Sequence, residues 1–261
     1  MILNIAEVHK IESEMLKVTV DLCNKHNIKY FMAYGSALGA VRHQGPIPWD
    51  HDVDLVITND QMDLFLKVFR EELPEKYYMD YYDINKYYTP SFPRIGLKGY
   101  VTSVVHIDIF ILTGISENKE EQKKLKTRMN IFRKMNRYKI ASDVYFQDLK
   151  GKKRIKFLFY KILFMPININ WIRKKLNSYY RAMPYKNSKF VTNPGGGYGL
   201  KEIVPKDYYG DGLIVKYDNI EVRIPEKYDL YLKHFYGDYM TFPPEKDRKI
   251  KESLIIQELT I

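Results

Sequence analysis

The chain has 261 residues, enough to bury the core of one large or two modest domains. A hydrophobic content of 45% excludes an intrinsically disordered protein, and the single cysteine, Cys23, excludes structural disulfides and a cysteine-rich zinc site. The net charge of +10 indicates attraction to anions, which charge alone leaves open among nucleotides, nucleic acid, anionic lipid and phosphorylated glycans.

The beginning of the chain predicts a cytoplasmic protein. Its first residues lack a basic start followed by a long apolar stretch, and no apolar window reaches the length of a membrane span.

The first half of the chain predicts helices that alternate with strands, from apolar spacing and short apolar runs. We expect a helix over 5–26, a strand over 28–34, a short helix over 36–43, a strand over 52–57 and a helix that ends near residue 73. Thr58 and Gln61 have the spacing of a capping box, which predicts Thr58 as the cap of that last helix.

The second half predicts three more strands and a long helical region. We expect strands over 77–83, 92–98 and 104–112, a helix over 117–140 and a basic, aromatic helical segment over 150–176. A flexible glycine-rich loop follows at 194–199, then a strand over 221–224 and a helix with Pro225 in its first position and Gly237 at its end.

Three aspartates on two predicted strands indicate a metal site. Asp52 and Asp54 are two residues apart, so on a strand their side chains share one face, and Asp108 lies inside an apolar strand. Carboxylates that converge with phosphate oxygens are suitable ligands for Mg²⁺. An acid pair alone also fits a solvated strand edge, but the distant third acid favours the metal site.

Gly35 and Ser36 lie where a strand leads into the short helix. Backbone N–H groups at a helix start bind phosphate, and a glycine there lets an anion approach the backbone closely. We therefore predict that Gly35 and Ser36 bind the phosphates of a nucleotide-type ligand beside the three acids.

Four further residues are candidates near this site. Arg42 is predicted either to bind a phosphate or to form a surface salt bridge, and Arg94 either to bind a ligand or to stand exposed on its strand. Asp50 is expected to support the acids or to orient Arg42. His106 is expected to share a strand face with Asp108 and to contact it, although a structural histidine is the commoner case.

Other features have two interpretations each. The 195–199 loop is either a cover for the ligand or a plain connection. The rings of Trp49, Tyr198, Tyr208 and Tyr209 form either a cage for a trimethylammonium group or ordinary packing. The segment Lys150–Lys175 either lies on an anionic membrane surface or is an amphipathic helix that covers the core.

With these residues in place, the sequence resembles the LicD/fukutin group of the nucleotidyltransferase fold superfamily. The resemblance rests on YGSALGAVRH at 34–43 and IPWDHDVD at 47–54. It continues in VPKDYY at 204–209 and YGDYMTFPP at 236–244, so it covers most of the chain. One departure is His51, where many relatives carry another acid. On a regular strand His51 faces away from Asp52 and Asp54.

The resemblance implies an α/β (α+β) nucleotidyltransferase fold, in which a mixed central sheet is flanked by helices and carries a helical insertion or second lobe. We expect a catalytic core over 1–115, a mainly helical lobe over 116–188 and a C-terminal segment over 189–261 that completes the active-site cleft.

The implied activity is a transferase that moves a phospho-alcohol, phosphocholine foremost, from a CDP-activated donor to a sugar hydroxyl of a cell-surface glycan, with release of CMP. The implied cofactor is Mg²⁺ or Mn²⁺, held by Asp52, Asp54 and Asp108, while Gly35 and Ser36 hold the donor. Whether Asp108 also deprotonates the acceptor stays open. The acceptor would be a glycan or a lipid-linked saccharide at the inner face of the cell membrane.

Other functions remain open at this point. CDP-ribitol or CDP-glycerol could replace CDP-choline as the donor, and the same acids suit a true nucleotidyltransferase that uses nucleoside triphosphates. A nucleic-acid-binding protein fits the charge alone, but no arginine-rich run or recognition-helix pattern supports it, so no nucleic-acid partner is expected.

Overall fold

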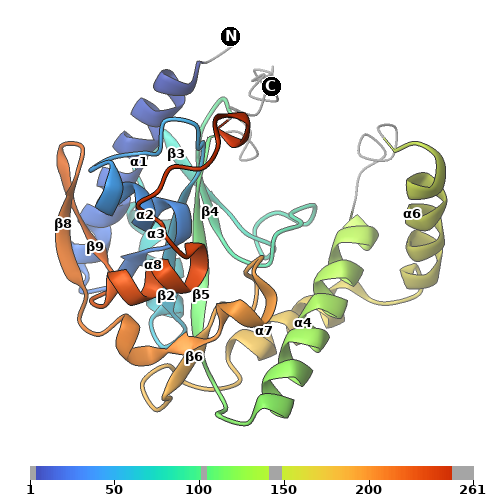
Figure 1. Cartoon of the computed structure of the whole chain (residues 1–261). Helices are drawn as coiled ribbons and strands as arrows, with labels where there is room; N and C mark the ends of the chain where they lie inside the picture. Colours follow the sequence, from blue (N-terminus) through green and yellow to red (C-terminus); the bar gives the residue numbers. More distant parts are fainter. Residues whose placement is uncertain (1–3, 101–104, 141–148, 249–261) are drawn as a thin grey trace.

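The computed structural model describes residues 4–100, 105–140 and 149–248 (Figure 1). The first half contains α1 (Ile5–Lys25), β1 (Tyr30–Met32), α2 (Tyr34–Arg42), β2 (Val53–Thr58), α3 (Met62–Glu72), β3 (Tyr77–Asp80), β4 (Arg94–Leu97) and β5 (His106–Ile115). The second half contains α4 (Lys119–Ile140), α6 (Gly151–Phe164), α7 (Ile169–Tyr180), β6 (Phe190–Thr192), β7 (Val204–Pro205), β8 (Leu213–Tyr217), β9 (Ile220–Ile224) and α8 (Tyr228–Tyr236). Short 3₁₀ turns follow at Gly199–Glu202, Lys206–Tyr208 and Glu245–Asp247.

The central sheet is mixed, as expected. Its strands follow the order β1-β2-β5-β4-β3, and β2 and β5 are parallel while the other pairs in this order are antiparallel. The far end of β5 pairs with β6, which pairs with β7. Every residue of β5 is buried, so this strand forms the centre of the core.

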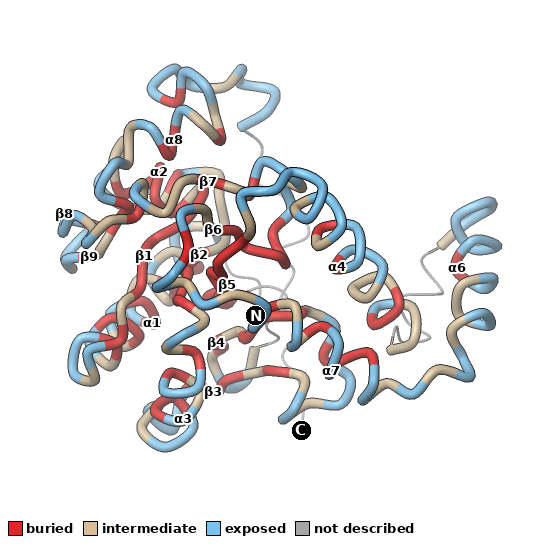
Figure 2. The backbone as a smooth tube through the Cα atoms, turned by 90° about the horizontal axis from the view of Figure 1, so that it is seen from below, coloured by how far each residue is buried: buried red, intermediate tan, exposed pale blue. Residues whose placement is uncertain are grey.

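Helices cover both faces of the sheet. Figure 2 shows α1 and α3 on one side and α2 with α8 on the other. A capping box begins α1, because Asn4 Oδ1 accepts from the Glu7 N–H at 3.0 Å and Glu7 Oε2 accepts from the Asn4 N–H at 2.8 Å. The α/β class with flanking helices is therefore confirmed.

Two local predictions were wrong. Thr58 is not a helix cap: it ends β2, and α3 begins only at Met62. Gln61 is engaged elsewhere, because its side chain accepts from the Lys29 N–H at 2.8 Å and donates to the Asn27 carbonyl at 3.0 Å. Pro225 does not begin a helix, since it follows β9 and α8 begins at Tyr228.

Other element boundaries moved by a few residues. The first strand spans only Tyr30–Met32, because the backbone turns into α2 at Tyr34, whose φ is +46°. Asp52 precedes β2, which begins at Val53. Gly237 ends α8 with a φ of +70°, as predicted. Val104, the expected start of the third strand, lies outside the described residues.

The helical lobe consists of α4, α6 and α7. The single helical segment expected over 150–176 is two helices that meet at an angle of 96°. In the described ranges no single helix is long and apolar enough to cross a membrane, and only this bent pair has the combined length and composition. Figures 1 and 2 both show α6 at the outer end of the lobe, away from the sheet.

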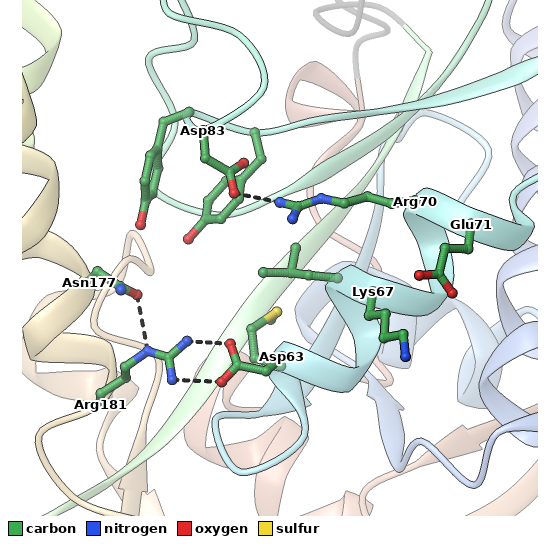
Figure 3. Close-up of a pocket in the computed structure, with 11 residues that line it drawn as sticks. Asp63, Lys67, Arg70, Glu71, Asp83, Asn177 and Arg181 are labelled. Atoms are coloured by element: carbon green, nitrogen blue, oxygen red, sulfur yellow. Dashed lines mark hydrogen bonds and ion pairs between the residues drawn. The ribbon is translucent and has the colours of Figure 1, made fainter.

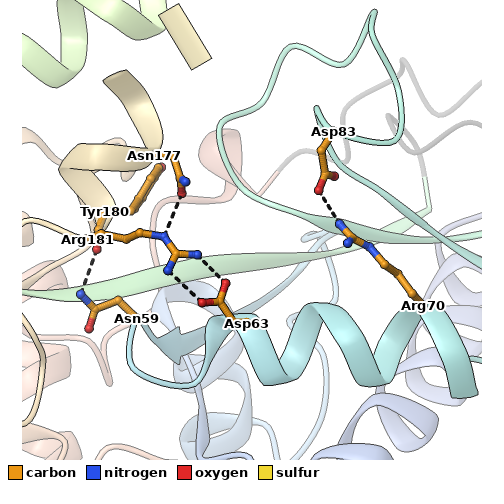
Figure 4. A network of polar contacts seen from close by, with 7 residues as sticks. All are labelled: Asn59, Asp63, Arg70, Asp83, Asn177, Tyr180 and Arg181. Atoms are coloured by element: carbon orange, nitrogen blue, oxygen red, sulfur yellow. Dashed lines mark hydrogen bonds and ion pairs between the residues drawn. The ribbon is translucent and has the colours of Figure 1, made fainter. Parts of the chain in front are cut away.

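Polar contacts dock the lobe onto the core (Figure 4). Asn59 Nδ2 donates to the carbonyls of Tyr180 and Met183 at 2.9 Å each, and Asn59 Oδ1 accepts from the Tyr185 N–H at 3.0 Å. Arg181 forms a two-pronged ion pair with Asp63 on α3. The same pair lies in a cavity of about 360 Å³ between α3 and α7 (Figure 3). The expected division of the chain into three segments stays a prediction.

Candidate active site

Two acids and an arginine stand side by side across the sheet. Parallel pairing places Asp54 of β2 opposite Asp108 of β5, and antiparallel pairing places Arg94 of β4 opposite Asp108. Directly paired residues on adjacent strands have their side chains on one face of the sheet. The structure thus brings Asp54 and Asp108 together as predicted, and it adds Arg94 to the same row.

Arg94 binds both oxygens of Asp108. Its Nε lies 2.5 Å from Oδ1 and its Nη2 lies 3.2 Å from Oδ2, and both side chains are largely buried. Burial raises the pKa of Asp108 above its usual range, while the Arg94 guanidinium lowers it. Arg94 is therefore no exposed strand arginine; it positions Asp108, and a direct contact between Arg94 and the ligand stays a prediction.

The acids repel one another around Asp54. Burial raises the pKa of Asp54 well above its usual value, and the charges of Asp52, Asp108 and Asp50 raise it further. Carboxylates whose charges raise one another's pKa have the chemistry to attract a divalent cation, which would offset their charge.

The carboxylates do not yet form a closed coordination shell. Among the described residues no three His, Cys, Asp or Glu side chains are placed as a complete ligand set. Both Asp108 oxygens are engaged by Arg94, and Asp52 lies just ahead of the strand. The hard oxygen donors suit Mg²⁺ or Mn²⁺, and substrate oxygens would have to complete the shell.

The start of α2 is joined directly to the acidic strand. The Ser36 hydroxyl accepts from the Asp54 N–H at 2.7 Å, and Ser36 is buried. Asp50 Oδ2 lies so close to Gly35 that a Cβ on Gly35 would stand 2.7 Å from it. The predicted phosphate-binding turn therefore lies next to the acids, and Asp50 covers Gly35.

Tyr34 holds this turn in a strained conformation. A positive φ is unfavourable for tyrosine, and three contacts offset it. The Tyr34 N–H donates to the Tyr231 hydroxyl at 3.2 Å, and the Tyr34 hydroxyl donates to Glu202 at 2.5 Å and accepts from Asn193 at 3.0 Å. The chain positions Gly35 and Ser36 through residues far away in the sequence.

The glycine-rich loop is anchored to the same network. Gly195 donates its N–H to Asn193 Oδ1 at 3.0 Å, and Glu202 Oε1 accepts from the Tyr198 N–H at 3.0 Å. Pro194, Gly195 and Gly196 are buried, whereas Gly197 and Tyr198 are exposed. Closure of this loop over a ligand stays a prediction. Within the loop, Tyr198 lines the cavity in which we expect a ligand to bind.

A cavity of about 660 Å³ opens beside Asp50 and the start of α2, and its lining does not include Asp52, Asp54 or Asp108. Its lining includes Gly35, Arg42 and Asp50 together with an aromatic group: Trp49, Tyr198, Tyr236, Tyr239 and Phe242. Arg42 donates to the Tyr239 carbonyl at 2.7 Å and lies 4.8 Å from the centre of the Phe242 ring, so it is no surface salt bridge.

Two of the four predicted cage residues line this cavity. Trp49 and Tyr198 do, whereas Tyr208 and Tyr209 do not. Tyr209 is instead packed in the core against Phe31. Tyr236, Asp238 and Phe242 also line the cavity and were not predicted to do so. All three fall in the 236–244 segment on which the family resemblance rests.

His106 and Glu12 lie under the acids. His106 Nε2 is 3.5 Å from Asp108 Oδ1, and burial, followed by the Arg94 charge, lowers the pKa of His106 well below its usual value. Glu12 of α1 was not predicted: it is 2% exposed, and burial with the charge of Asp52 raises its pKa. The sequence signal for a buried Glu12 was its place among the apolar residues on one side of the predicted helix.

Comparisons with known proteins agree with this geometry. Residues 27–150 match the family described as LicD/FKTN/FKRP, nucleotidyltransferase domain. The chain is 28% identical to the lipopolysaccharide cholinephosphotransferase LicD of Haemophilus influenzae over 90% of this chain and 92% of that protein. It is also 49% identical, over 47 residues, to uncharacterised proteins of Rickettsia prowazekii and Rickettsia typhi.

The matched region contains α2, β2 and β5, and with them every predicted acid and phosphate-binding residue. Residues 27–150 therefore form a domain that matches the LicD family, and 90% of the chain is similar to the Haemophilus LicD protein.

Proposed function

We propose that this protein transfers a phospho-alcohol, most readily phosphocholine, from a CDP-activated donor to a sugar hydroxyl of a cell-surface glycan, releasing CMP. The Haemophilus relative named as a lipopolysaccharide cholinephosphotransferase supports a choline donor and a glycan acceptor. The acceptor would be a lipid-linked saccharide presented at the inner face of the cell membrane.

The observation that carries this proposal is the aromatic cavity beside Gly35, Arg42 and Asp50. Its rings already contact cations, since the Arg248 guanidinium lies 5.7 Å from the centre of the Trp49 ring and 5.3 Å from that of Phe242. Asp50 and Asp238 add two carboxylates to the lining. Aromatic faces with carboxylates recognise quaternary ammonium groups, which favours choline over ribitol or glycerol.

The proposed roles follow from the positions of the side chains. Gly35, Ser36 and Arg42 would bind the donor diphosphate at the start of α2. Asp52, Asp54 and Asp108 would hold Mg²⁺ or Mn²⁺, which offsets the charge on the diphosphate oxygens when bound. Asp108, kept in place by Arg94, is our candidate to accept the proton of the attacking hydroxyl.

A donor panel tests the proposal. The purified protein is incubated with Mg²⁺ and CDP-choline, CDP-ethanolamine, CDP-ribitol or CDP-glycerol, and the release of CMP is measured. We expect the fastest release from CDP-choline, and a loss of at least 100-fold in Asp54→Asn, the order reported for losing one electrostatic group in an active site.

Two results would contradict the proposal. Pyrophosphate release from nucleoside triphosphates, with no CMP from any CDP-alcohol, would identify a nucleotidyltransferase instead. Preference for CDP-ribitol or CDP-glycerol would keep the transferase and reject the choline cage. Trp49→Leu tests the choline cage directly. If the Trp49 ring binds choline, this variant should raise KM for CDP-choline more than KM for CDP-glycerol.

A further inference from the structure

The outer helix of the lobe has two apolar faces, and among the described residues only one of them is packed. Phe157 is buried, and its ring centre lies 5.3 Å from that of Tyr138 on α4. Tyr160 and Phe164 also contact Tyr138, at 5.0 and 6.4 Å. These residues, spaced by three and four, form the inner face of α6.

The opposite face carries large apolar side chains in contact with solvent. Ile155 is 69% exposed, Phe159 60% and Ile162 66%, and they too are spaced by four and three. With their exposed neighbours they form the outer patch of α6: Ile155, Leu158, Phe159, Ile162, Leu163 and Met165. A patch of this kind on a soluble protein indicates a binding surface.

The described segment that contains the outer patch has charges of a single sign. Residues 149–201 contain 13 lysines and arginines and no aspartate or glutamate. On α6 itself Lys152, Lys153 and Lys156 are exposed beside the patch. A helix with exposed apolar residues flanked by lysines matches the interface of an anionic bilayer, where lysines bind headgroups and apolar side chains enter the acyl boundary.

We propose that α6 is a membrane-binding helix that lies flat on an anionic bilayer through its outer patch. The interpretation of this segment as a cover for the core does not hold for that face, because its side chains are exposed and α6 lies at the outer end of the lobe, away from the sheet (Figures 1 and 2). The inference extends the proposed function, since a lipid-linked acceptor is met at a membrane, but membrane binding can be measured without any turnover.

Vesicle sedimentation tests this inference. The full chain is mixed at low salt with vesicles of phosphatidylcholine alone or of equal parts phosphatidylcholine and phosphatidylglycerol. We expect binding only to the anionic vesicles and release by high salt. Replacing Lys152, Lys153 and Lys156 by Gln should weaken binding on the order of 100-fold, from about fivefold for each lysine. Lys10, Lys119 and Lys216 replaced by Gln are the matched control and should weaken it much less.

A second variant tests the apolar face. Ile155→Ser, Phe159→Ser and Ile162→Ser together should weaken binding at least tenfold, because three buried side chains are lost from the bilayer. The control replaces three exposed apolar residues elsewhere, Ile84, Ile214 and Leu230, by Ser. Circular dichroism and thermal unfolding should match the wild type in both, since all six residues are exposed.

Three outcomes would overturn the inference. The first is no binding of the wild type to anionic vesicles, or equal loss in the patch variant and its control. The second is a dimer in solution that the patch variant dissociates, which would make a second copy of the chain the occupant of the patch. The third is binding that resists alkaline carbonate, which would mean insertion of α6 and α7 instead of surface contact. A protein that binds vesicles but releases no CMP would keep this inference and lose the proposed function.

Discussion

The acidic cluster is the most unfavourable arrangement of charge in the described part of the site. Asp54 faces Asp108 across two paired strands, with Asp52 and Asp50 close enough to raise its pKa further. Arg94 binds Asp108, and its charge lowers the pKa of Asp54 less than burial and the neighbouring acids raise it. This repulsion among the acids supports our proposal that they hold a divalent cation.

The raised pKa of Asp54 predicts a pH dependence of stability. Between about pH 3.8 and its folded pKa, the folded protein keeps a proton that the unfolded chain has released, so stability falls as pH rises, by up to about 1.4 kcal/mol per pH unit. Asp54→Asn lacks this group. Without divalent cations, its advantage in unfolding free energy should be near zero around pH 4 and should grow with pH, as measured by urea denaturation.

A matched control is available in Asp83→Asn. Asp83 is an exposed acid paired with Arg70, and its loss should change stability by no more than about 1 kcal/mol. A difference between Asp54→Asn and the wild type that stays constant from pH 4 to the pH of the activity assay would contradict the charge repulsion described here.

Among the elements, α2 is fixed at its start by contacts with distant parts of the chain. The helix begins at a tyrosine with positive φ, its Ser36 binds the backbone of β2, and Asp50 covers Gly35. Strain at a helix start is tolerated when surrounding contacts fix it, and such positions cluster at functional sites. Here Tyr231, Asn193 and Glu202 provide those contacts.

Gly35→Ala tests the close approach of Asp50. The added methyl group would stand 2.7 Å from Asp50 Oδ2, so Asp50 or α2 must move. We expect a loss of stability of about 1–2 kcal/mol and a fall in kcat/KM for the CDP-alcohol of at least tenfold.

Gly197→Ala is the control, because nothing lies within 4 Å of a Cβ at that position. It should change stability by no more than about 0.5 kcal/mol. Equal effects of the two substitutions on kcat/KM would show that the space at Gly35 is not what the site requires.

In the whole molecule, Asn59 makes several of the hydrogen bonds that join the helical lobe to the core. Asn59 follows β2 and binds Thr113, Tyr180, Met183 and Tyr185, which lie on β5 or at the end of the lobe. The same stretch of chain thus ends the strand that carries Asp54 and fixes the position of α7 (Figure 4).

Asn59→Ala should destabilise the protein by about 2–4 kcal/mol, since several partners lose a hydrogen bond and some remain buried. The matched control is Arg181→Ala, which breaks the exposed ion pair with Asp63 and should cost no more than about 1 kcal/mol. Urea denaturation measures both. A smaller effect of Asn59→Ala than of Arg181→Ala would refute this account of docking.

The sequence by itself determined the alternation of helices and strands, the acids on two strands and the glycine and serine at a helix start. These follow from local periodicity and from the chemistry of each residue. Two local patterns were misleading. At Thr58 the strand continues through the predicted cap and α3 begins later, and after Pro225 the helix α8 also begins later than predicted.

Only the tertiary structure decided which side chains meet. Strand register placed Arg94 on Asp108, a turn placed Asp50 over Gly35, and α8 with the residues after it brought Tyr236 and Phe242 to the cavity. It also left the outer patch of α6 exposed while the inner face packs on α4. The physical reason is that these contacts join residues far apart in the chain, and local patterns carry no information about such distances.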